Sequence, residues 1–123
     1  MRVLIIEPDK LLADNLSQVL KAAGHEASWQ VDLQAAVEDI EAKRPQAIVL
    51  DLFLARRSGL ELIYELRSYP DWQNIPIIIW SQAAGDEIQA LLADQENFGP
   101  LQYHHKPAAS LSDIVSSLAL VPA

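Results

Sequence analysis

Three short segments of this chain consist entirely of apolar residues, and they constrain its fold more than any other feature. They are Val3 to Ile6, Ala47 to Leu50 and Ile77 to Trp80. Such runs are typical of strands that are buried on both faces of a parallel sheet. Two further segments, 27–31 and 101–105, alternate apolar with polar residues, which indicates edge strands.

Helical periodicity fills the intervals between these segments. The sequence predicts five helices: one along 12–23 that Gly24 ends, one between the cap Asp32 and Arg44-Pro45, one that opens with a capping box at 58–61, one around Ile88, Leu91 and Leu92, and one after the cap Ser110. Strands and helices therefore alternate along the chain.

This order predicts an α/β fold, a five-stranded doubly wound parallel sheet of the flavodoxin-like type with helices on both faces. Central strands one, three and four and edge strands two and five fit the spatial order 2-1-3-4-5. We expect one domain over residues 1–123, because this length suits a single core. In such sheets a ligand binds beyond the carboxyl ends of the strands, where the strand order reverses.

Charge and composition exclude several classes of function. The net charge of -8 opposes binding to nucleic acid, since a phosphate backbone must be neutralised by clustered Lys and Arg. No cysteine is present for disulfides or thiol chemistry. The apolar runs are too short to span a bilayer and no signal peptide pattern is visible, so we expect a cytoplasmic protein with no membrane partner.

Polar residues follow four of the predicted strands and would meet at one edge of the sheet. They are Glu7 and Asp9 after the first strand, Asp51 after the third, Ser81 after the fourth and Lys106 after the fifth. The acid after strand one, "VLDLFL", "IIIWS" and "YHHKP", in this order and spacing, resemble the receiver domain of two-component response regulators. The resemblance covers nearly the whole chain.

The resemblance implies a signalling domain that is phosphorylated on Asp51 by a histidine kinase or a phosphotransfer protein. Ser81 would hydrogen-bond a phosphoryl oxygen, and Lys106 would pair with the same group. Such a domain is not an enzyme in the usual sense, because it catalyses only its own phosphotransfer and dephosphorylation. Ser81 and Tyr103 would form the switch that remodels the face of the fourth helix, fifth strand and fifth helix, to which a downstream protein binds.

The resemblance also implies a Mg²⁺ site, and here the chain departs from the family pattern. Relatives have two successive acids after strand one, whereas this chain has Glu7 and then Pro8. Glu7, Asp51 and the backbone carbonyl of Phe53 remain as expected ligands, and they predict weak Mg²⁺ binding. Asp9 is a further candidate ligand, although an N-cap of the first helix explains an acid there equally well.

Pro8 leaves a second interpretation open. The chain would then be a pseudo-receiver, a binding module that keeps the fold but is not phosphorylated because its metal site is incomplete. A third interpretation, a nucleotide or flavin binder, lacks the glycine-rich loop that it needs after strand one. His104 and His105 point to opposite faces of a strand, so we assign them no chemistry.

Overall fold

The computed structural model describes residues 1–54, 58–82, 89, 93, 99–106 and 109–121. Its sheet has five parallel strands in the order β2-β1-β3-β4-β5, which confirms the predicted topology. The strands are β1 Arg2–Ile6, β2 Glu26–Gln30, β3 Ala47–Leu50, β4 Ile77–Ser81 and β5 Leu101–His105.

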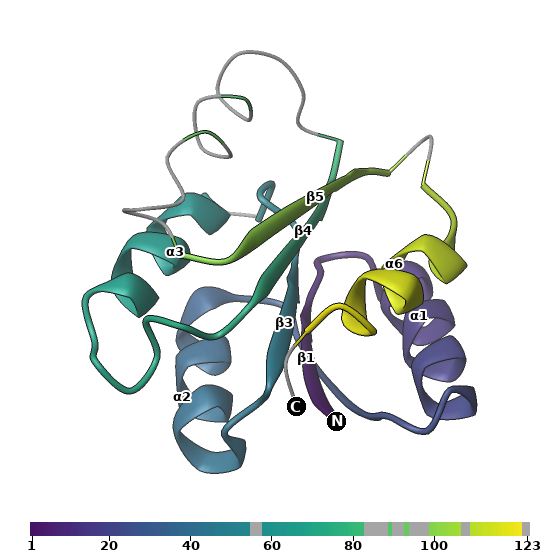
Figure 1. Cartoon of the computed structure of the whole chain (residues 1–123), viewed down its shortest axis with the longest axis horizontal. Helices are drawn as coiled ribbons and strands as arrows, with labels where there is room; N and C mark the ends of the chain where they lie inside the picture. The colour runs from purple at the N-terminus through teal and green to yellow at the C-terminus, as the bar shows by residue number, and fades with distance from the viewer. Residues whose placement is uncertain (55–57, 83–88, 90–92, 94–98, 107–108, 122–123) are drawn as a thin grey trace.

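Helices cover both faces of this sheet, as predicted (Figure 1). Helices α2 (Leu33–Lys43) and α3 (Gly59–Arg67) lie on one face, and α1 (Lys10–Ala22) and α6 (Leu111–Leu118) lie on the other. The helix predicted around Ile88, Leu91 and Leu92 falls outside the described residues, although Gln89 and Ala93 have helical geometry.

The core consists of two apolar layers, one on each face of the sheet. Leu4 and Ile6 pack into the layer under α2 and α3, whereas Val3 and Ile5 pack into the layer under α1 and α6. Strands β3 and β4 divide their residues between the layers in the same alternating way. This is why the three central strands are continuous apolar runs in the sequence.

The edge strand β2 differs in two ways from the alternating strand predicted at 27–31. It ends at Gln30, and Val31 is 44% exposed beyond it. Its polar residues Ser28 and Gln30 do not simply face water, because both donate to the buried carboxylate of Asp39 on α2. Alternation in the sequence identified the edge strand but not the polar contacts on its second face.

The helix ends mostly follow the predicted capping residues. Asp32 caps α2 by accepting from the amide of Ala35, and Gly24 follows α1 with φ +91°. At α3 the hydroxyl of Ser58 accepts from the amide of Leu60, the second helical residue, at 3.2 Å. The reciprocal capping box lies instead at α6, between Ser110 and Asp113.

No helix in the described part of the chain is long and apolar enough to cross a membrane.

Candidate functional site

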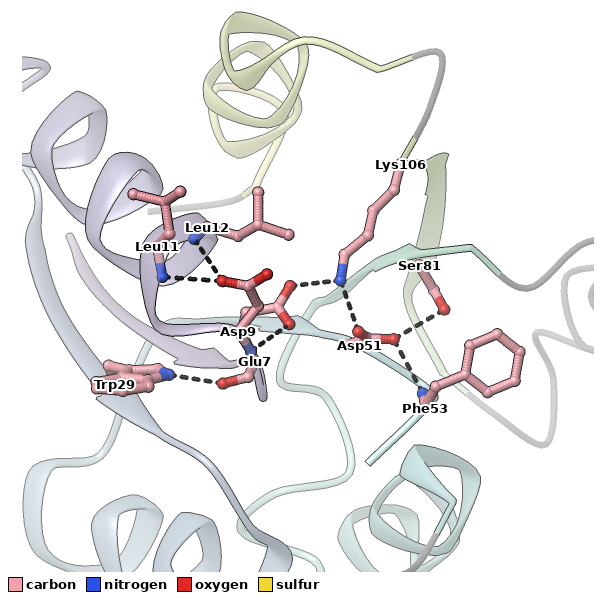
Figure 2. A network of polar contacts seen from close by, with 9 residues as sticks. All are labelled: Glu7, Asp9, Leu11, Leu12, Trp29, Asp51, Phe53, Ser81 and Lys106. Atoms are coloured by element: carbon pink, nitrogen blue, oxygen red, sulfur yellow. Dashed lines mark hydrogen bonds and ion pairs between the residues drawn. The ribbon is translucent and has the colours of Figure 1, made fainter. Parts of the chain in front are cut away.

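The carboxyl ends of β1, β3, β4 and β5 bring Glu7, Asp51, Ser81 and Lys106 together (Figure 2). The parallel ladder sets their positions, because the amide of Asp51 donates to the carbonyl of Ile6 and that of Lys106 to the carbonyl of Ser81, both at 2.9 Å. This is the edge of the sheet at which the strand order predicts a ligand site.

Asp51 is buried, with 5% of its surface exposed, and both of its carboxylate oxygens accept hydrogen bonds. Oδ1 accepts from the hydroxyl of Ser81 and from the amide of Phe53, each at 2.9 Å. Oδ2 accepts from Nζ of Lys106 at 2.6 Å. A buried carboxylate needs such donors, since an unpaired charge in an apolar interior is strongly disfavoured.

The Lys106 ammonium bridges two acids. Besides Asp51 it contacts Oε1 of Glu7 at 2.6 Å, and its side chain is only 11% exposed. It also lies 5.4 Å from the ring centroid of Trp80, within the range of a cation–π contact. Burial lowers the pKa of Lys106, but the hydrogen bonds and charges of Asp51 and Glu7 together outweigh it and raise that pKa above its ordinary value.

Glu7 is the second buried acid, with 1% of its surface exposed. Oε2 accepts from the amide of Asp9 at 3.1 Å, and Oε1 has the Lys106 ion pair but no hydrogen-bond donor of ordinary geometry in the described structure. Burial raises the pKa of Glu7, while Lys106 and the Asp9 amide oppose the rise and the charge of Asp51 adds to it. Each Glu7 oxygen therefore has one partner among the described residues, the Lys106 ammonium for Oε1 and the Asp9 amide for Oε2.

Pro8 and Asp9 form the turn between β1 and α1. Asp9 is the N-cap of α1, since its Oδ1 accepts from the amides of Leu11 at 2.9 Å and Leu12 at 3.3 Å. The exposed Pro8 ring needs no amide partner, and the turn closes through the bond from the Asp9 amide back to the Glu7 side chain. The structure thus favours the capping explanation of Asp9.

The carboxylate oxygens at this edge of the sheet are suitable ligands for a Mg²⁺ ion that is held by few protein groups. Glu7 and Asp51 supply two carboxylates, and Phe53, a residue that is 60% exposed, follows Asp51 closely in the chain and donates its amide to Asp51 Oδ1. No group of three His, Cys, Asp or Glu residues among those described is arranged as a metal site. Mg²⁺ commonly takes one or two carboxylates with water and phosphate oxygens, so two acids are sufficient.

The remaining candidate residues lie along β5. Tyr103 is half-buried against the layer of α2 and α3, and its ring centroid is 6.4 Å from that of His105. His104 points to the other face, where its Nε2 lies 2.5 Å from the hydroxyl of Ser117 on α6. The two histidines therefore do not share a site, as predicted.

Sequence reasoning missed two tryptophans of the site. Trp80 packs beside Lys106, and the indole of Trp29 donates to the backbone carbonyl of Glu7 at 2.7 Å. The alternation of β2 placed Trp29 on its apolar side, but no sequence pattern indicates a hydrogen bond from an indole to a neighbouring strand end.

A model of the response regulator receiver domain matches residues 3–115 of the chain. The chain belongs to the response regulator receiver family. The resemblance inferred from the strand-end motifs is thereby confirmed, and the chain is a signalling module of the two-component type.

Curated relatives include several response regulators. Response regulator MprA of Mycobacterium avium is 28% identical over 100 residues, which are 81% of this chain and 44% of MprA. Protein Rrf1 of Nitratidesulfovibrio vulgaris is 30% identical over 87 residues, 71% of this chain and 63% of Rrf1. The chain thus matches less than half of the length of MprA.

Solved receiver structures share the fold over almost their whole length. A putative response regulator from Chloroflexus aurantiacus is 28% identical with a TM-score of 0.82, covering 98% of this chain and 95% of that one. The Mn(2+)-bound form of response regulator Rcp1 is 25% identical with a TM-score of 0.75, covering 95% and 88%. Chemotaxis protein CheY4 of Vibrio cholerae has a TM-score of 0.85 at 19% identity, covers 98% of each chain, and supports the fold alone.

Proposed function

We propose that this receiver domain accepts a phosphoryl group on Asp51 from a phosphohistidine of a histidine kinase or phosphotransfer protein. One observation carries the proposal. A buried carboxylate at the switch point of the sheet faces a hydroxyl, a backbone amide and an ammonium whose side chain is 11% exposed, each from a different segment of the chain. Carboxylates form acyl phosphates on other folds as well, so the chemistry suits this side chain.

The two oxygens of Asp51 are unequal as nucleophiles. Oδ1 already accepts from Ser81 and Phe53, whereas the one partner of Oδ2 among the described residues is the Lys106 ammonium. Oδ2 would therefore attack phosphorus. The new O–P bond forms as the P–N bond to the histidine breaks, and the electron pair of that bond stays on the imidazole nitrogen.

Lys106 and Ser81 would then move to the phosphoryl oxygens. Unit charges of opposite sign about 4 Å apart attract by about 4 kcal/mol at an effective dielectric constant of about 20, so the ammonium stabilises the developing charge appreciably. The Ser81 hydroxyl needs only to change its acceptor, because it already points at Asp51.

Glu7, Asp51 and the carbonyl of Phe53 would hold Mg²⁺ during this step. When bound, the ion neutralises charge on the phosphoryl oxygens and on the attacking carboxylate. Asp9 is committed to the amides of α1, so we expect it to contribute little to the site. With Pro8 in place of a second acid, the affinity for Mg²⁺ would be weak.

Phosphorylation would be transmitted along β5 to a downstream protein. As Ser81 turns to the phosphoryl group, Tyr103 would move further inward and change the surface expected to comprise the fourth helix predicted from the sequence, β5 and α6. Tyr103 is already half-buried on β5, which supports its role as the moving part. Comparing structures with and without a phosphoryl mimic tests this step, and an unmoved Tyr103 would contradict it.

The phosphorylation itself is tested with a small phosphodonor such as acetyl phosphate and Mg²⁺. We expect a mass gain of one phosphoryl group, and hydroxylamine should convert the acyl phosphate to a hydroxamate that peptide mapping places at residue 51. No mass gain with Mg²⁺ or Mn²⁺ would contradict the proposal and favour the pseudo-receiver, a binding module that is not phosphorylated.

A further inference from the structure

The backbone carbonyl of Glu7 lies just beyond the end of the ladder between β1 and β2. The amide of Glu7 still donates to the carbonyl of Gln30 at 3.2 Å, but β2 ends at that residue. The Glu7 carbonyl accepts instead from Nε1 of Trp29 at 2.7 Å (Figure 2). Beyond the end of β2, a side chain of that strand thus supplies the hydrogen bond to β1 that a backbone amide would otherwise donate.

Trp80, the second tryptophan near the site, shows that a buried indole N–H in the described part of this protein does not always have a hydrogen-bond acceptor. The indole N–H of Trp80 is buried and has no hydrogen-bond partner in the described structure. An indole N–H that is withdrawn from water without a partner is costly, so pairing depends on an acceptor in the right place. The Trp29 indole has one, at a short distance, on the backbone of a site residue.

Pro8 links the carbonyl of Glu7 to the carboxylate of the same residue. Because the proline ring fixes φ, a tilt of the peptide between Glu7 and Pro8 can be compensated only by rotation about ψ of Pro8 before it reaches the amide of Asp9. That amide donates to Oε2 of Glu7 at 3.1 Å, while Oε1 contacts Nζ of Lys106 at 2.6 Å. The direction of the Glu7 carbonyl therefore helps to set the direction of its carboxylate.

We propose that Trp29 is a positioning residue for Glu7. Its indole N–H holds the Glu7 carbonyl and, through the turn at Pro8 that the Asp9 amide closes, aims the Glu7 carboxylate at Lys106 and at a cation bound beside Asp51. The part that concerns the cation rests on the proposed function. The part that concerns the turn applies to the metal-free protein and is tested there.

Amide hydrogen exchange, measured by NMR on the metal-free chain, tests the turn. Trp29→Phe keeps an aromatic ring but removes the donor. We expect the Asp9 amide to exchange about fivefold faster, as loss of one ordinary hydrogen bond would give. The Ala35 amide, which donates to Asp32 Oδ1 at 2.8 Å, is an internal control and should not change.

Trp72→Phe is the matched control variant. Trp72 is also half-buried, but it precedes β4 and therefore lies at the amino ends of the strands, away from the carboxyl ends that carry the site. It should lower thermal stability as much as Trp29→Phe or more, yet leave exchange at Asp9 unchanged. If Asp9 exchanges at the wild-type rate in Trp29→Phe, or equally fast in both variants, the proposed positioning role is wrong.

A Mg²⁺ titration followed by NMR shifts tests the second part. We expect Trp29→Phe to bind Mg²⁺ about tenfold more weakly than the wild type, the lower end of the effects seen for groups that support metal ligands. An affinity equal to that of Trp72→Phe would overturn this part. The proposed function fails separately, if the wild type gains no phosphoryl group while the exchange difference at Asp9 is present.

Discussion

Asp51 and Asp39 are two buried carboxylates with similar partners and different surroundings. Each is 5% exposed, and each accepts from a serine hydroxyl and an N–H group and faces a lysine. For Asp39 these are Ser28 at 3.3 Å, Gln30 at 3.0 Å and Lys43 at 3.5 Å. Burial and the kinds of donor therefore do not distinguish the proposed phosphoacceptor from the other buried carboxylate.

The two lysines do distinguish them. Lys43 is one turn from Asp39 on the same helix, and its side chain is 59% exposed, so water screens the pair. Lys106 comes from another strand, is 11% exposed, and is shared between Asp51 and Glu7. A partly buried cation held by two acids at the carboxyl edge of the sheet is suited to receive a further anion. Asp39 instead joins α2 to an edge strand.

Removing each lysine should produce the largest contrast. Lys106→Ala should slow phosphorylation of Asp51 about 100-fold, as loss of one preorganised donor does elsewhere. It should also lower the free energy of unfolding by about 3 kcal/mol, because two buried acids lose their counter-charge. Lys43→Ala should leave the phosphorylation rate unchanged and cost less than about 1 kcal/mol.

Mass spectrometry of the phosphorylation time course and urea unfolding of both variants measure these effects. Equal effects on the phosphorylation rate in the two variants would remove the distinction between the lysines.

The serine hydroxyls give the next contrast. Ser81→Ala should slow phosphorylation about tenfold, because a hydrogen bond to a charged group contributes about 1.5 kcal/mol or more. Ser28→Ala removes the matching donor to Asp39 and should not alter the rate, although both variants lose some stability. A rate in Ser81→Ala equal to that in Ser28→Ala would show that the Ser81 hydroxyl acts only in folding.

Pro8→Asp tests whether the absence of a second acid after β1 limits Mg²⁺ binding. The added carboxylate should tighten Mg²⁺ binding by roughly tenfold, since one further charge at about 4 Å contributes about 1 to 4 kcal/mol between water and a partly buried site. It should also lower the stability of the metal-free protein by adding a like charge near Glu7 and Asp51.

Calorimetric titration of both proteins with Mg²⁺ measures the change. If the wild type binds as tightly as Pro8→Asp, then Asp9 or another oxygen fills the place of the second acid.

The smallest expected effect is the contribution of Glu7 to the pH dependence of the free energy of unfolding. Its pKa in the folded protein is raised above 4.5, so the ionised carboxylate costs stability at pH values above the folded pKa. Protonation removes this cost as the pH falls through that pKa. Glu7→Gln resembles the protonated form, so without metal it should be more stable than the wild type at neutral pH.

Urea unfolding in EDTA between pH 4.5 and 8 measures the difference between the two proteins, starting from the ordinary pKa of the glutamate. The advantage of Glu7→Gln should shrink as the pH falls. A constant difference over this range would contradict the raised pKa.

The fold and the meeting of Glu7, Asp51, Ser81 and Lys106 at one edge were predictable because both depend on strand ends. Runs buried on both faces placed the strands, and the residue that follows each run then faces the carboxyl edge, which located Asp51 and Ser81. Asp39 was not predictable, because its burial depends on Ser28 and Gln30 from a strand whose alternation suggested an exposed polar side. The Trp29 bond depends on where β2 stops, and element ends are the least certain part of a sequence pattern.

The central claim is that Asp51, and not the equally buried Asp39, accepts the phosphoryl group. Intact mass measurement of the wild type, Asp51→Asn and Asp39→Asn with acetyl phosphate and Mg²⁺ tests it most directly, after circular dichroism has shown that each variant is folded. We predict a gain of one phosphoryl group in the wild type and in Asp39→Asn, and none in Asp51→Asn. A phosphoryl gain in Asp51→Asn, or its loss in a folded Asp39→Asn, would contradict the claim.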